Sequence, residues 1–405
     1  MSVLTYKKIL IITCEEIPHP HYGASSVLYF QYILSLIKSK HEVIHISINT
    51  NDNFDKKKID AYKNKLRKYK NFTFRSIKIK KIYKNLRLSY FYKNIETEKL
   101  NFQIVKFIKT LNPDKIIAFD ITAASIAKNI FSKKALYIWL GDLKFVTYFY
   151  HFLYDFKENF LKILYFPFYY IVIKKWKKFY YTILKNSYVI NGSFSNVSEL
   201  KRIAIKSKYL PYPWPKLSKS KEKKKFIKPS FIFFGNLLGL GSRSGLNFLF
   251  DKIYPLFLKE WGHNNFKIYI CGRFNFRQHF AKKIININEI KFKGYLKNLN
   301  TLADKCHAVI FPINVPVGNR SRIITALSNY WPIVAHPSVT FGNPSLISNK
   351  NCFLAKNPNK FFYYCKQLYL NKKLSSFIVN NGFKTYLENF EPSSAVKIFK
   401  KEINV

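Results

Sequence analysis

Two arginines stand where positive charge is already present. Arg320 and Arg322 follow a small-residue turn, Gly318 and Asn319, and open the helical run within PVGNRSRIITALSNYWPIVAHP (316–337). A helix N-terminus carries a partial positive charge, so cations there are unfavourable unless an anion joins them. Free backbone N–H groups and arginine side chains at a helix start are groups that bind phosphate. The stretch therefore predicts an anion site.

Two more loops with arginines follow apolar runs that we expect to be strands. FFGNLLGLGSRSG contains Gly235 and Arg243, and CGR ends in Arg273. In parallel sheets ligands bind beyond the carboxyl ends of the strands, so three such loops favour an anionic ligand over plain tight turns. GLGSRSG also suits a dinucleotide, with Arg273 against a 2′-phosphate. Because this unit lies in the second half of the chain and no hydride-transfer partner stands out, a dinucleotide is the less favoured ligand.

The apolar pattern predicts the elements that hold these loops. KKILIITC (7–14) is a continuous apolar run, 27–40 has helical spacing, and HEVIHISI (41–48) returns as a strand. This βαβ pattern implies an α/β fold with parallel sheets. The Lys-rich residues 52–100 stay unassigned. A Pro/Ser/Lys-rich stretch (209–230) resembles a linker, and the alternation restarts after it.

Composition restricts the class of protein. The chain has 405 residues and a formal net charge of +47, which predicts attraction to polyanions such as phosphorylated ligands or an acidic membrane. The five cysteines are unpaired in sequence and the histidines lack zinc-type spacing, so no disulfide framework or metal site is expected. The N-terminus resembles no signal peptide, and the apolar run 163–173 is too short for a spanning helix.

Several stretches together resemble a GT-B fold glycosyltransferase of the group 1, or family four, type. They are IPHPHYGASS, LIKSKHEV, YLPYP, FFGNL, YICGR, KFKGYL and, most strongly, residues 306–344. The resemblance implies two Rossmann-like domains whose parallel sheets face a central cleft. The expected parts are an acceptor-side domain (1–208), a linker (209–229), a nucleotide-sugar domain (230–385) and a C-terminal helix (386–405) that packs back on the first domain.

In that family, residues 306–344 would place the donor's diphosphate at a helix N-terminus. The resemblance implies these donor-binding residues: Gly235, Asn236, Arg243, Arg273, Tyr295, Gly318, Asn319, Arg320, Arg322 and Thr325. The family often carries two glutamates eight positions apart, and this chain has Val317 and Thr325 there. The second glutamate normally contacts the donor ribose, so this departure puts the nucleotide-binding mode and activity in question.

The acceptor side is expected in the first half. The turn Gly23, Ala24 and Ser25 follows the first strand, and the resemblance places it near the reacting groups. The alternative is a helix start capped by Ser25 or Ser26. Asp142, in WLGDL, stands next to the place of a histidine in many relatives. Its expected role is to orient an acceptor hydroxyl or stabilise positive charge in the transition state; capping the following helix is the alternative.

The resemblance implies transfer of a sugar from a UDP- or GDP-sugar to a glycan or lipid-linked acceptor. It also implies retention of configuration, no metal or other cofactor, and a role in surface polysaccharide or lipopolysaccharide synthesis. A cytoplasmic location follows, with peripheral binding to the inner face of the membrane. The alternative is a catalytically degenerate GT-B scaffold that binds membranes or other polyanions. No nucleic-acid-binding motif is present.

Residues 143–186 combine aromatic clusters with lysines. Phe168, Tyr169, Tyr170 and Trp176 suit the boundary between water and lipid, and the lysines suit anionic lipids. The alternative is that these aromatic side chains are ordinary core, with the lysines in solvent.

Overall fold

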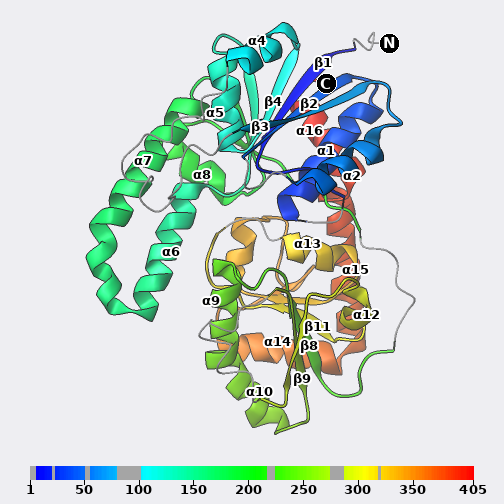
Figure 1. Ribbon diagram of the computed structural model, residues 1–405. Coiled ribbons are helices and arrows are strands. Elements are labelled where there is room, and N and C mark those ends of the chain that lie inside the picture. Colours follow the sequence, from blue (N-terminus) through cyan, green and yellow to red (C-terminus); the bar gives the residue numbers. More distant parts are fainter. Residues whose placement is uncertain are drawn as a thin grey trace. The chain divides into compact units, whose positions relative to one another are not determined.

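The chain folds into two units, each built on a parallel β-sheet (Figure 1). A computed structural model describes residues 6–20, 23–50, 55–79, 102–216, 224–273, 287–317 and 321–405. The first unit comprises Met1–Pro213 and Ala395–Val405, and the second comprises Trp214–Ser394. The division between the units falls within the predicted linker, 209–229.

The first unit has a seven-stranded sheet in the order β3-β2-β1-β4-β5-β6-β7, and all pairs are parallel. The side chains of Ile9–Ile12 are fully buried, because helices cover both faces of β1, an inner strand of the sheet. The strands are β1 (Lys8–Cys14), β2 (Glu42–Thr50), β3 (Phe72–Ile79), β4 (Lys115–Phe119), β5 (Leu136–Leu140), β6 (Tyr188–Asn191) and β7 (Lys208–Tyr209).

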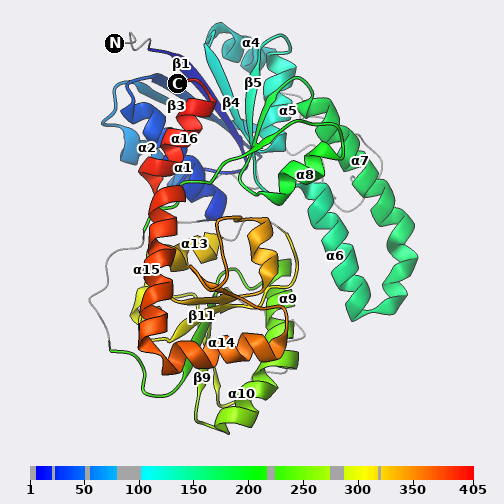
Figure 2. The ribbon, with the colours of Figure 1, turned by 180° about the vertical axis from the view of Figure 1, so that it is seen from behind.

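Helices connect these strands, and a C-terminal helix returns to them (Figure 2). Phe399 of that helix is fully buried, and its ring centroid lies 4.2 Å from that of Tyr32. The helices are α1 (Ala24–Lys38), α2 (Lys56–Leu66), α4 (Phe102–Thr110), α5 (Ile121–Ile130), α6 (Lys144–Glu158), the 3₁₀ helix η2 (Phe160–Tyr165), α7 (Phe166–Leu184), α8 (Ser195–Lys201) and α16 (Pro392–Glu402).

Two residues of this unit, His45 and Lys128, make polar contacts that join its elements. The His45 ring nitrogens lie 3.0 Å from Thr13 Oγ1 and 3.0 Å from the Tyr62 hydroxyl, and burial lowers the pKa of His45 to about 3. At the C-terminus of α7, the Lys128 ammonium donates to three carbonyl oxygens. These belong to Thr182, Ile183 and Lys185, at 3.1, 2.8 and 2.6 Å. A cation at this end of a helix also opposes the helix dipole.

The second unit has a six-stranded parallel sheet in the order β10-β9-β8-β11-β12-β13. Its strands are β8 (Ser230–Phe234), β9 (Lys267–Cys271), β10 (Ile290–Gly294), β11 (Ala308–Phe311), β12 (Ile333–Ala335) and β13 (Phe353–Leu354). Its helices are α9 (Leu240–Phe248), the π-helix η3 (Leu249–Ile253), α10 (Tyr254–Trp261), α12 (Asn300–Ala303), α13 (Ser321–Ser328), the 3₁₀ helix η4 (Pro337–Phe341), α14 (Pro358–Leu370) and α15 (Lys372–Asn389).

The predicted α/β class and its parallel sheets are confirmed. β1 and β2 match the strands predicted at 7–14 and 41–48 to within two residues, and helix 27–40 begins earlier, at Ala24. The unassigned segment 52–100 contains α2 and β3; its residues 52–54 and 80–100 lie outside the described part. α2 was overlooked because lysines dominate it, although Ile59, Tyr62 and Leu66 form a buried face. Among the described residues, none of the helices has the length and apolar composition that crossing a bilayer requires.

Candidate functional site

The loops after β8 and β9 leave the second sheet side by side. Phe234 pairs with Cys271 at the carboxyl ends of these strands, and the Gly235 N–H donates to the Cys271 carbonyl oxygen at 3.0 Å. The two backbones touch: a Cβ added at Gly272 would lie 1.9 Å from the Gly235 oxygen. Gly272 also has a φ of +150°, so both its conformation and its surroundings require glycine.

Arg322 lies against this pair of loops. It is the second residue of α13, and its guanidinium occupies the space beside Gly235, where an added Cβ would lie 2.7 Å from Arg322 Cζ. Arg322 Nη2 donates to Ser242 Oγ at 3.1 Å, and the guanidinium carbon lies 5.6 Å from the ring centroid of Phe233. Arg322, at the start of α13, is thus held at the carboxyl edge of the sheet, in the space left by the absent side chain of Gly235.

Ser242 links Arg322 to the loop after β8. The Ser242 hydroxyl donates to the Asn236 carbonyl oxygen at 2.6 Å, and Asn236 Oδ1 accepts from the Leu238 N–H at 3.2 Å. The Asn236 side chain therefore shapes its own loop. Gly239 is the N-cap of α9, and Arg243 lies one turn into that helix, half-buried.

Three of the remaining predicted donor residues, Arg273, Tyr295 and Thr325, lie among the described residues. Arg273 follows β9 and is exposed, and Tyr295 follows β10 and is 61% exposed. Thr325 is buried; its hydroxyl accepts from Trp214 Nε1 at 2.9 Å and donates to the Ser321 carbonyl oxygen at 3.1 Å. This hydroxyl stabilises the second unit itself. Gly318, Asn319 and Arg320 lie outside the described residues.

In the first unit, Gly23 precedes α1 with a φ of +76° and serves as its N-cap without a side-chain hydrogen bond. The idea that Ser25 or Ser26 caps this helix is wrong, because both serines lie inside it. The Ser26 hydroxyl instead donates to the Ile17 carbonyl oxygen. Ala24 begins the helix.

Asp142 is exposed and lies two residues beyond the end of β5. The N-cap of α6 is the next residue, Leu143, which makes no side-chain capping bond. The Gly141 carbonyl oxygen accepts from Asn196 Nδ2 at 2.6 Å, which holds the loop that carries Asp142. Both Asp142 and Asp120 act electrostatically on the buried Tyr180 hydroxyl, so the two carboxylates lie in one region.

Sequence reasoning missed two carboxylates at this edge. Glu16 follows β1, and Asp120 follows β4 as the N-cap of α5, accepting from the Ile121 N–H at 2.7 Å. Burial raises the pKa of Glu16; hydrogen bonds from Ser25 and Ser26 oppose this rise, and Asp120 adds to it. Each carboxylate stands within two residues of the end of a parallel strand, a place that we searched for ligand-binding residues only in the second half.

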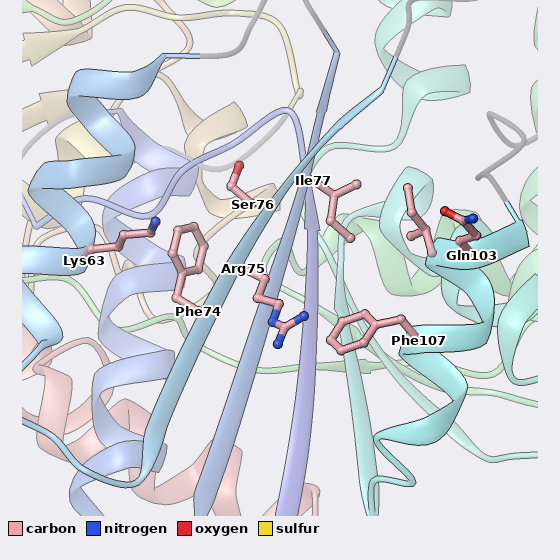
Figure 3. A pocket seen from close by; sticks show the side chains of 8 residues that line it. Lys63, Phe74, Arg75, Ser76, Ile77, Gln103 and Phe107 are labelled. Carbon is pink, nitrogen blue, oxygen red and sulfur yellow. The ribbon is translucent and has the colours of Figure 1, made fainter.

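A pocket with a volume of about 460 Å³ lies at the β3 edge of the first sheet (Figure 3). The Arg75 guanidinium lies 4.1 Å from the ring centroid of Phe107 and forms part of its wall. The pocket is on β3, and three strands of the sheet, β2, β1 and β4, separate β3 from β5, the strand before Asp142. Its lining residues are Lys63, Phe74, Arg75, Ser76, Ile77, Gln103, Ile104 and Phe107.

Two Rossmann-like halves with parallel sheets define the GT-B class of fold. Residues 228–371 match the family model "Glycosyl transferases group 1", so this part of the chain is a group 1 glycosyltransferase domain. No curated protein matches the chain by sequence.

Solved structures with this fold align with nearly the whole chain. HepE from Anabaena, in complex with UDP, has a TM-score of 0.66 and 13% identity over 98% of this chain and 99% of that chain. A glycosyltransferase from Rickettsia africae has a TM-score of 0.65 and 15% identity over 98% and 99%. WaaG, a glycosyltransferase involved in lipopolysaccharide biosynthesis, has a TM-score of 0.61 and 12% identity over 96% and 99%. The predicted fold and resemblance are therefore confirmed.

Proposed function

We propose that the protein transfers a sugar from a nucleotide sugar to an acceptor hydroxyl. The observation that carries the proposal is Arg322, held against Gly235 at the start of α13, within the group 1 glycosyltransferase domain. UDP-sugars are the first donors to test, because HepE was solved with UDP and with UDP-glucose. GDP-sugars are the second.

The leaving group explains why an arginine is needed. When the acceptor oxygen bonds to the anomeric carbon, the bond from that carbon to the phosphate oxygen breaks, and its electron pair leaves with the nucleoside diphosphate. In the same overall step the acceptor hydroxyl gives its proton to a phosphate oxygen of the departing diphosphate. Arg322 and the N–H groups of α13 would stabilise the diphosphate charge, with Arg243, Arg273 and Arg320 as further candidates. We expect retention of configuration and no need for a metal ion.

The acceptor side is proposed at the carboxyl edge of the first sheet. Asp142 would orient the acceptor hydroxyl or stabilise positive charge on the sugar, and the turn at Gly23 would border the reacting groups. The acceptor class is a glycan or lipid-linked glycan of a surface polysaccharide or lipopolysaccharide pathway. Such an enzyme would work in the cytoplasm, at the inner face of the membrane.

One observation favours a second candidate, a degenerate GT-B scaffold that binds membranes or polyanions without catalysis. Val317 and Thr325 replace the paired glutamates, and the Thr325 hydroxyl is engaged by Trp214 and Ser321. This candidate predicts nucleotide binding without transfer, or no nucleotide binding.

A thermal-shift screen with UDP-, GDP- and ADP-sugars tests the proposal, since a ligand that binds only the folded state raises the melting temperature. In Arg322→Ala we expect UDP affinity to fall by about 10- to 150-fold, the loss of a charged hydrogen bond worth about 1.5–3 kcal/mol. Arg202→Ala, at an exposed arginine of the first unit, is the matched control.

The melting temperature without ligand separates lost binding from lost folding. Arg322→Lys keeps the charge but loses the fork that reaches Ser242, so an intermediate affinity is expected. If Arg322→Ala folds and binds UDP and GDP as tightly as the parent, the donor site is assigned wrongly.

A further inference from the structure

An apolar segment of the first unit has all its side chains at least partly exposed. It comprises η2 and the start of α7, residues 160–171, here called the hairpin tip. Exposed large apolar side chains occupy most of its positions. The exposed fractions are 77% for Leu164, 70% for Phe160, 69% for Leu161, 60% for Tyr165, 56% for Tyr170, 50% for Phe166, 48% for Ile171, and 43% for both Ile163 and Phe168. A contiguous patch of this kind marks an interaction surface.

Beyond the tip, α7 packs against the core of the first unit. α7 buries one face through Val172, Trp176, Tyr180 and Ile183, and the Trp176 ring centroid lies 6.1 Å from that of Tyr180. The expectation that Trp176 stands at a lipid boundary is therefore wrong for this residue. Phe168 and Tyr170 are exposed, as that expectation required.

The tip is carried away from the sheet of its own unit. α6 and α7 run side by side and project beyond that sheet, and their connection lies at the far end (Figures 1 and 2). Lys128 fixes the opposite end of α7 through three carbonyl oxygens. The tip is thus presented on a supported pair of helices.

Lysines flank the apolar tip along the chain, on α6 and α7, and one lies within it. Residues 156–180 contain six lysines and one acid, Glu158. Lys162 forms an ion pair with Asp155 at 3.8 Å and remains 41% exposed. The other five are exposed: Lys157, Lys174, Lys175, Lys177 and Lys178. An apolar centre with a basic margin matches the acyl region and the anionic headgroups of a bilayer.

We infer that the hairpin tip docks the protein on an anionic lipid bilayer. The apolar side chains of η2 enter the interface, the tyrosines lie at headgroup level, and the lysines contact lipid phosphates. A second copy is the poorer occupant, since two tips with the same excess of lysines repel each other. The inference extends the proposed function to the acceptor's location, and its test needs no transfer activity.

Vesicle flotation of the full chain tests the inference. Vesicles contain phosphatidylcholine alone, or with phosphatidylglycerol at about three to one, an anionic surface that attracts lysines. Binding is expected on the anionic vesicles at low salt, with a large loss at about 0.5 M salt, where charges are screened. Leu161→Ser with Leu164→Ser should lower the bound-to-free ratio by about tenfold or more, because apolar insertion is lost.

Matched controls locate the effect. Ile227→Ser with Leu370→Ser removes exposed apolar side chains of the second unit, 89% and 60% exposed, and should leave binding unchanged. Lys177→Gln with Lys178→Gln should weaken binding by about 25-fold, at roughly fivefold for each lysine near the surface. The same pair of changes at the exposed Lys372 and Lys373 should weaken it much less.

Three results would overturn the inference: no flotation at low salt with anionic lipid in excess, equal losses in tip and control variants, or a dimer in light scattering that the tip changes dissociate. UDP binding by the tip variants keeps the two proposals separate. Variants that bind UDP but no longer float support the docking surface whatever the fate of the donor site. A parent that floats but binds no nucleotide sugar contradicts only the transfer reaction.

Discussion

Replacing Gly272 with alanine tests whether the loops after β8 and β9 act as one rigid support. The added Cβ would lie 1.9 Å from the Gly235 backbone oxygen, whereas ordinary contacts are at 3.4 Å or more. A backbone oxygen cannot rotate away as a flexible side chain can, so the two loops must separate. Overpacking of this kind costs about 1–3 kcal/mol. The φ of +150° adds about 1–3 kcal/mol for a residue with a Cβ.

Gly294→Ala is the matched control, because Gly294 also has a positive φ, +61°, but nothing lies within 4 Å of its added Cβ. It should lose about 1–2 kcal/mol, the cost of the left-handed conformation alone. The two variants should differ by about 1–4 kcal/mol, so the second unit should melt roughly 2–16 °C lower in Gly272→Ala than in Gly294→Ala, at about 2–4 °C per kcal/mol.

Differential scanning calorimetry measures both melting temperatures, and titration with UDP follows the donor site. If the loops support Arg322 through Gly235, Gly272→Ala should also weaken UDP binding while Gly294→Ala does not. Equal melting temperatures in the two variants would refute the close-packing argument.

Three further outcomes are expected. Asp142→Asn should lower turnover more than donor affinity; a similar loss of stability and activity would indicate a structural role instead. Below about pH 6.5 the unfolded chain protonates His45, but the folded chain keeps it neutral until about pH 3, so its contribution to stability is complete above pH 6.5 and falls by up to about 1.4 kcal/mol per pH unit on acidification. Urea unfolding from pH 7 to pH 4.5 should show a shallower fall for His45→Gln, and parallel curves would contradict the neutral state. Lys128→Met should destabilise the first unit by about 1.5–3 kcal/mol, as expected for lost hydrogen bonds to a charged group, while Lys133→Met, at an exposed position, should be close to neutral in the same assay.

The sequence predicted elements well where one pattern dominates. β1 is a continuous apolar run, and burial on both faces of a parallel sheet requires that pattern. It failed at α2, where three buried residues among lysines gave a weaker signal than the charge. Trp176 shows the same limit, because only packing against Tyr180 reveals which face of α7 is inside.

The candidate site was predictable as a place but not as a set of contacts. Arginines after successive strands indicated the correct sheet edge for Arg322. Its approach to Gly235 joins residues far apart in the sequence and depends on strand order, which composition does not encode. The Trp214 bond to Thr325 is equally long-range. Glu16 and Asp120 needed no structure, since both follow strands.

The last residues of the chain belong to the first unit, and this affects the order of events during synthesis. Residues 395–405 follow the whole second unit, yet Phe399 and Ile403 are fully buried in the first. At roughly 5–20 residues per second, residues 214–394 take about 10–35 s to emerge. Throughout that interval the nascent first unit lacks the Phe399 ring, which packs against Tyr32 in the folded protein. A chaperone that recognises aromatic surface would therefore have the most time to bind at α1. A ribosome stalled within the second unit would leave a first unit that lacks residues 395–405.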